Sequence, residues 1–156
     1  MTLEELAYIS QIVGVAAVFA SLIFVGVQVR QNTAVTRAAL HQSFTAAMNH
    51  LNATMAQSPD LSRIWLTGAK DRMALNETER WQFDMLCLSY FHVFDTMHYQ
   101  TRSGVGETKL LKAEENGLRT LISLPGIRSW WEENPYGYSA EFRAYAESLA
   151  VRKDGA

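Results

Sequence analysis

The sequence predicts an all-α protein, in which one N-terminal transmembrane helix continues into a helical bundle. The stretch from Ile9 to Val29 carries no charge, and as a helix it is long enough to cross a hydrocarbon core of ~30 Å. Beyond it, apolar residues recur at helical spacing, and no alternating strand pattern occurs. Only 19% of the 156 residues are charged, below the ~25% typical of soluble domains.

The N-terminal stretch has the features of a retained membrane anchor. A secretory signal peptide has a basic start and a shorter apolar run, whereas this stretch is preceded by Glu4 and Glu5. The first charges after it are Arg30 and Arg37, and basic residues favour the cytoplasmic flank of a span. We therefore expect residues 1–30 to form an anchor with its N-terminus outside, and residues 31–156 to form a cytoplasmic domain.

Small and polar residues line one side of the anchor. At 100° per residue they share one helix face, which lets two backbones approach closely. We call this set the small-residue stripe: Ser10, Gly14, Ala17, Ser21, Gln28 and Asn32. One interpretation is a surface for self-association. The alternative is that small residues are scattered through an Ala- and Val-rich span, with Gln28 at the lipid headgroups.

The first helix is predicted to run on to about residue 57, because no proline or glycine follows Gly26 until Pro59. The stripe then continues along the same side of the helix with Val35, Ala39, Ser43, Ala46, His50 and Ala53. The opposite side is apolar and should pack against the rest of the chain; it carries Leu40, Phe44, Met48, Leu51 and Met55.

Local signals place the later helices at about 59–67, 77–103, 107–123, 126–134 and 140–153. Ser58 precedes Pro59 as an N-cap, and Gly68 should end that helix. Asn76 and Glu79 have capping-box spacing, and Ser139 should cap the last helix. The 77–103 segment is apolar on two faces, which is typical of the buried middle of a bundle; the second face carries Trp81, Met85, Leu88 and Tyr99.

Charge and motifs favour a protein without catalytic activity. The net charge of −2 and the lack of a basic cluster argue against nucleic acid as a partner. The candidates for a metal site are His92, Asp95 and His98, but di-iron bundles need a second such pair from facing helices. We therefore expect no cofactor and no metal, with Cys87 as a small buried side chain.

Trp130 and Trp131 belong to the densest aromatic group in the chain. Aromatic residues gather at membrane interfaces, so the pair could rest on a bilayer. The alternative is that one tryptophan fills the bundle core and the other covers its edge.

Four blocks resemble a recurrent set of small bacterial proteins with an N-terminal span and a helical domain that carries a Trp-Trp pair. The blocks are ASLIFVGVQVRQNT, PDLSRIWLTG, LNETERWQFDMLCLSYFHVFDTMHYQ and LPGIRSWWEENPYGYSAEFRAY. The resemblance implies a bacterial inner-membrane location. It carries over no activity.

Three functions fit these patterns. The first is a homo-oligomeric membrane scaffold or accessory subunit of a larger membrane complex, in contact with lipid and self-associating through the stripe. The second is a homo-oligomeric pore with the stripe facing water. The third and weakest is a membrane-anchored metalloenzyme that uses His92, Asp95 and His98.

Overall fold

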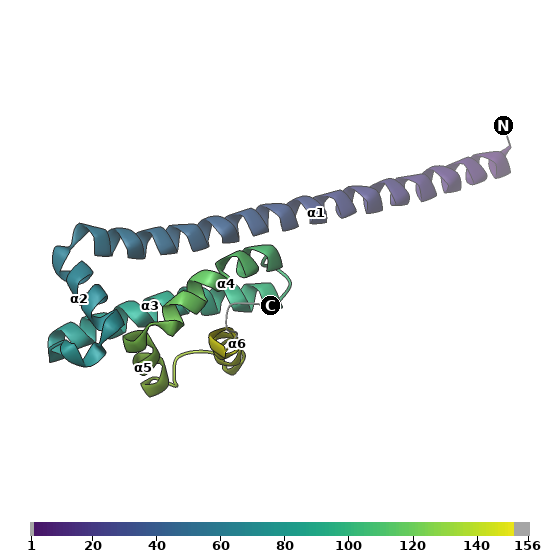
Figure 1. The fold of residues 1–156 in the computed structure, drawn as a ribbon. Helices are drawn as coiled ribbons and strands as arrows, with labels where there is room; N and C mark the ends of the chain where they lie inside the picture. Colours follow the sequence, from purple (N-terminus) through teal and green to yellow (C-terminus); the bar gives the residue numbers. More distant parts are fainter. Residues whose placement is uncertain (1, 152–156) are drawn as a thin grey trace. The chain divides into compact units, whose positions relative to one another are not determined.

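The chain folds as an all-α protein in a computed structural model, which describes residues 2–151 (Figure 1). Within that range the backbone forms no strand, which confirms the predicted fold class. The helices are α1 (Leu3–Gln57), α2 (Pro59–Lys70), the 3-10 turn η1 (Arg72–Ala74), α3 (Glu77–Arg102), α4 (Thr108–Ser123), α5 (Pro125–Glu133) and α6 (Ala140–Val151).

The chain divides into two compact units, residues 1–38 and residues 39–156. The described part of the first unit is almost entirely the N-terminal portion of α1, and every residue from 2 to 38 is exposed. Phe19, Leu22, Ile23 and Phe24 each expose more than 60% of their surface. By length and composition, α1 is able to cross a membrane.

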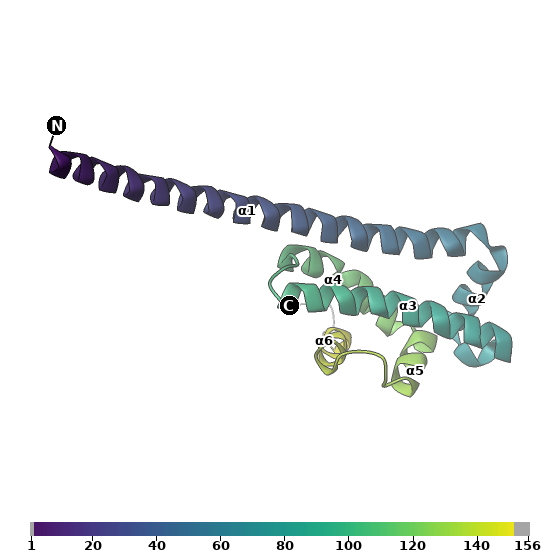
Figure 2. The same cartoon turned by 180° about the vertical axis from the view of Figure 1, so that it is seen from behind.

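Helices α2 to α6 of the second unit, whose ribbons Figure 2 shows from behind, bury one apolar core between them. Helix α2 packs against α3 and α5, and α4 packs against α5 and α6. Phe83, Phe91, Ile122, Trp131 and Phe142 are completely buried at its centre. Burial of each such side chain contributes roughly 1.5–3 kcal/mol to folding, so this core supplies the stability of the unit.

The predicted helix starts are confirmed at three caps. The Ser58 hydroxyl accepts a hydrogen bond from the Leu61 amide at 3.3 Å. Asn76 and Glu79 accept each other's backbone amides, at 2.9 and 3.1 Å, in a complete capping box. The Ser139 hydroxyl accepts from the Phe142 amide at 3.2 Å. Each cap satisfies a backbone donor that the first turn of a helix leaves free.

The prediction that Gly68 ends the second helix is wrong. Helix α2 continues to Lys70, and the turn η1 follows it. Gly68 lies inside α2. Glycine is needed at this position because a Cβ would come within 2.5 Å of the Phe83 ring and 2.8 Å of Leu75. The other predicted helix ends agree with the structure to within a residue, except that the last helix was predicted to reach 153, and residues 152–153 lie outside the described range.

The interpretation that the tryptophan pair rests on a bilayer is wrong, and the alternative is right that a tryptophan fills the core but wrong that the other covers its edge. Trp130 is 2% exposed and Trp131 is 0% exposed, so neither side chain covers an edge or reaches a bilayer. Both rings pack on Phe91, with centroids at 5.5 and 4.7 Å. Successive residues of α5 can both be buried because Gly126, Ile127, Trp130 and Trp131 form one broad face of the helix, whereas Glu132 and Glu133 on the other side are exposed.

Helix α3 is buried on one face only, contrary to prediction. Phe83, Phe91 and Phe94 on one side are at most 2% exposed. On the other side, Leu88 is partly buried against the core, but Trp81 and Tyr99 are 63% and 69% exposed. The bundle is therefore a layer on one face of α3, and α3 is not surrounded by other helices.

A charged cluster joins η1, α3 and α5. The buried Arg72 guanidinium donates two hydrogen bonds of 2.8 Å to the Asp84 carboxylate and one of 2.5 Å to Glu133. A bidentate arginine–carboxylate pair fixes both distance and angle. The pKa of Glu133 is held below its usual value, chiefly by the hydrogen bond from Arg72. This cluster fixes the irregular η1 turn between two helices.

Candidate functional site

The three residues predicted as a weak metal site lie on α3 but do not form a common site. A ring nitrogen of His92 lies 3.1 Å from the Gly137 carbonyl oxygen, whereas the Asp95 carboxylate accepts a hydrogen bond of 2.9 Å from the Ser139 hydroxyl. His98 is turned toward α6. Among residues 2–151, no three His, Cys, Asp or Glu side chains are grouped so that they could hold a metal ion.

His98 and Asp95 hold the last helix against the bundle. The His98 ring stacks on Tyr145 of α6 with centroids 4.7 Å apart, and the Tyr145 hydroxyl donates to Glu115 of α4 at 3.0 Å. Burial lowers the pKa of His98, and the nearby Arg102 charge acts in the same direction. The neutral imidazole is therefore the favoured form, which suits a packed ring.

Cys87 is completely buried in the core. Burial raises the pKa of its thiol far above the ordinary value, and the negative charge of Asp84 adds to the effect. Because the thiolate is the reactive form of cysteine, this side chain is unsuited to nucleophilic chemistry. Its place in the structure matches the prediction of a small buried side chain.

The small-residue stripe lies on the exposed part of α1. All six stripe residues are exposed, as are Arg30 and Arg37. The hydroxyls of Ser10 and Ser21 donate to carbonyls of their own helix, Ala7 at 2.8 Å and Ala17 at 2.9 Å. A Cβ added at Gly14 would meet nothing within 4 Å, so the backbone at this point is open to a neighbour.

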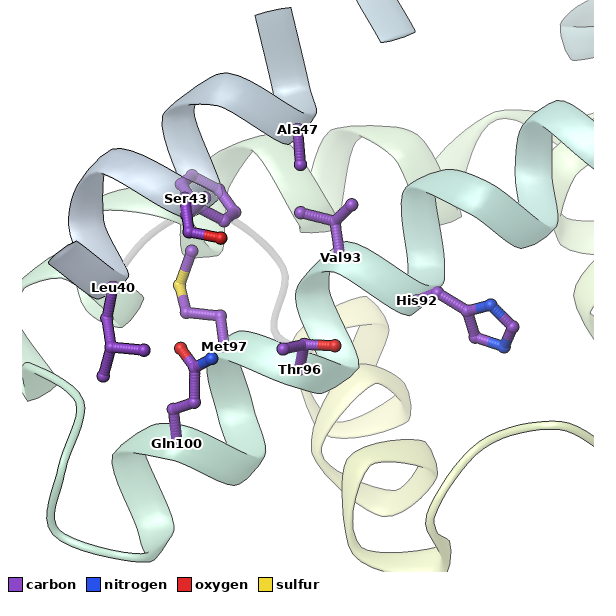
Figure 3. A pocket seen from close by; sticks show the side chains of 9 residues that line it. Leu40, Ser43, Ala47, His92, Val93, Thr96, Met97 and Gln100 are labelled. Atoms are coloured by element: carbon purple, nitrogen blue, oxygen red, sulfur yellow. The ribbon is translucent and has the colours of Figure 1, made fainter. Parts of the chain in front are cut away.

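A hollow of about 180 Å³ lies between the second half of α1 and α3 (Figure 3). Leu40, Ser43 and Ala47 approach it from α1, and Val93 and Met97 approach it from α3. The remaining lining residues are Phe44, His92, Thr96 and Gln100. Most of its exposed lining is apolar, so it suits an aliphatic group better than an ion.

A second, more open hollow of about 520 Å³ lies farther along the same helix. Met48, Asn52 and Met55 border it from α1, and Trp65 and Tyr90 border it from α2 and α3. Its far side is formed by Phe94 of α3 and by Glu114, Asn116, Gly117, Thr120 and Leu121 of α4.

Sequence reasoning missed both hollows, although one signal was available. It predicted correctly that Phe44 and Met48 pack against the bundle. It placed Ser43 on the free side of the helix, whereas Ser43 lines the first hollow. The small side chains of Ser43 and Ala47 beside the larger Leu40 and Phe44 indicate a gap in the packing.

The chain was also compared with known proteins. No family model matches it, and no curated protein or solved structure is detectably similar. The function therefore has to be inferred from the residues and their geometry.

Proposed function

We propose that this chain is a single-pass membrane protein that self-associates through α1 and serves as a scaffold or accessory subunit of a membrane complex. The observation that carries this proposal is the exposure of residues 2–38, which include a long uncharged apolar stretch. Apolar surface of this extent is unfavourable in water. A bilayer, with further copies of the helix, would cover it.

The orientation that we propose places the N-terminus outside and the second unit in the cytoplasm. Arg30 and Arg37 support it, because both follow the apolar stretch, whereas Glu4 and Glu5 precede it. The resemblance to small bacterial proteins supports the bacterial inner membrane as the location.

Close helix packing is the mode of association that the stripe supports best. Gly14 and Ala17 let two backbones approach, which strengthens van der Waals contact in lipid. Ser10 and Ser21 add little, because their hydroxyls are already bonded within their own helix. A pore is less well supported, because residues 9–29 contain no charge with which to build a selective ring.

The experiment compares leucine substitutions on two faces of the helix. Gly14→Leu and Ala17→Leu should separate the backbones and lower the oligomeric state, because a larger side chain prevents close approach. Gln28→Leu should have a smaller effect, since interhelical hydrogen bonds in membranes average only ~0.6 kcal/mol. The measurement is mass photometry and crosslinking of the full chain, in detergent and in nanodiscs.

Val13→Leu and Val18→Leu are the matched controls, because they add bulk on other faces and keep the helix apolar. Equal assembly of stripe and control variants would exclude the stripe as the interface. A monomer in both media would exclude self-association altogether, and a different membrane subunit would then be the partner to seek.

A further inference from the structure

The part of α1 that follows residue 38 covers α3 and α4 incompletely. Its inward residues Leu40, Phe44, Met48, Leu51 and Met55 are all only half-buried. No residue of α1, a helix that the structure describes in full, reaches full burial. Helix α3 by contrast buries eight residues, including Phe83, Phe91 and Phe94.

The contact between α1 and α3 is narrow. Phe44 meets Phe94 edge to face, with ring centroids 6.1 Å apart. The 180 Å³ hollow lies on one side of this contact and the 520 Å³ hollow on the other. Atoms that line a gap lose the dispersion contacts that a filled interface would provide, so these hollows weaken the attachment of α1.

One side-chain hydrogen bond joins α1 to α3. The Tyr90 hydroxyl of α3 donates a 2.5 Å hydrogen bond to the Asn52 side chain, the only side-chain hydrogen bond between α1 and α3, two helices described in full. At the far end, Ser58 and Pro59 form the turn into α2, and the Ser62 hydroxyl donates to the Met55 carbonyl at 2.7 Å. The hydrogen bond from Ser62 joins α2 to the end of α1 and does not depend on the contact between α1 and α3.

We propose that residues 40–55 of α1 form a strap that detaches from α3 and α4 while the core of the second unit stays folded. Segments with few buried apolar contacts open at a lower free energy than the core of the same protein. The turn at Ser58–Pro59 acts as the hinge. Release uncovers Phe94 and Met97 of α3, which line the two hollows.

The test compares two thiols in the full chain in nanodiscs. Met97→Cys places a thiol beside the first hollow, whereas the native Cys87 is enclosed by the core. A maleimide should label position 97 at least about tenfold faster than Cys87, with a rate that depends little on denaturant, because strap release exposes little surface. Labelling is followed for each position by peptide mass spectrometry, and Val93→Cys is a second site if Met97→Cys does not fold.

Substitutions in α1 distinguish detachment of the strap from entry of the maleimide through the hollow while α1 stays in place. Asn52→Ala removes the tie to Tyr90 and borders only the second hollow, so it should speed labelling at position 97 by about three- to tenfold. Ala47→Leu should fill the first hollow and slow labelling. Ala46→Leu, on the outward side of the helix, is the matched control and should leave the rate unchanged.

Two results would overturn the strap. One is labelling of position 97 and Cys87 at the same rate with the same dependence on denaturant, which would mean that α1 leaves only when the core unfolds. The other is a labelling rate at position 97 that Asn52→Ala leaves unchanged, even if Ala47→Leu slows it, because filling the hollow also slows entry of the maleimide when α1 stays in place.

Discussion

Gly126 allows α5 to approach the backbone of α2 closely. A Cβ at Gly126 would collide with the Gly68 carbonyl oxygen and lie 3.1 Å from the Arg72 amide. Backbone groups cannot move aside as a flexible side chain can. The absence of a side chain at residue 126 therefore allows α5 to bring Trp130 and Trp131 into the core.

At the residue scale, Gly126→Ala should lower the free energy of unfolding. Overpacking of a tight contact costs roughly 1–3 kcal/mol, and here the obstacle is backbone. The measurement is urea unfolding of the full chain in a mild detergent, followed by tryptophan fluorescence, because Trp130 and Trp131 lie in the core.

Gly117→Ala is the matched control for this substitution. Gly117 lies inside α4, exposed, and a Cβ there would meet only a Glu114 oxygen at 3.9 Å. Alanine should stabilise that helix by about 0.5–1 kcal/mol. A loss of stability in both variants would show that the Gly68–Gly126 contact is not what makes residue 126 sensitive.

At the scale of the elements, helix starts could be predicted from sequence and helix partners could not. Ser58, Asn76 and Ser139 are local signals, because a cap acts on amides two or three residues away. Local signals predict a helix end at Gly68, but glycine is needed there because of the Phe83 ring, which is distant in sequence. Tertiary contact overrides local propensity at such a position.

The distinction between local signals and tertiary packing also applies to the candidate site. The inward face of α1 could be predicted from its helical spacing, and Phe44 and Met48 do pack there. The hollows beside it depend on how well two surfaces fit, and periodicity contains no information about fit. The second face of α3 is a further example. Trp81 and Tyr99 are aromatic, as residues of a buried face often are, but no neighbouring helix covers them.

The capping box of α3 provides a test of one element. Asn76→Ala should lower the free energy of unfolding by about 0.5–2 kcal/mol, whereas Asn76→Gly should cost only a few tenths. The reason is that alanine removes the acceptor for the Glu79 amide, and glycine leaves that amide open to water. Thermal unfolding followed by circular dichroism measures both, and equal losses would contradict a capping role.

At the scale of the whole molecule, the proposed orientation is testable with fusions. A phosphatase that is active only outside the cytoplasm should be inactive when fused after Ala156, and a fluorescent protein that fails to fold outside should be bright there. The charge difference between Glu4 and Glu5 on one side and Arg30 and Arg37 on the other is the physical reason.

Replacing Arg30 and Arg37 together by glutamate should reduce the fluorescence and raise the phosphatase activity, because the basic flank is lost. An active phosphatase on the unaltered chain would reverse the proposed orientation.

The cluster around Arg72 also has a consequence for how the sequence is able to evolve. Loss of Arg72 alone would leave the Asp84 carboxylate, which is only 20% exposed, without its partner, and breaking a buried ion pair in this way is strongly destabilising. Replacement of both residues by apolar side chains of similar size costs far less. We therefore expect positions 72 and 84 to tolerate replacement together better than loss of Arg72 alone, and Glu133, with 55% of its side chain exposed, to be the less costly of the two carboxylates to replace.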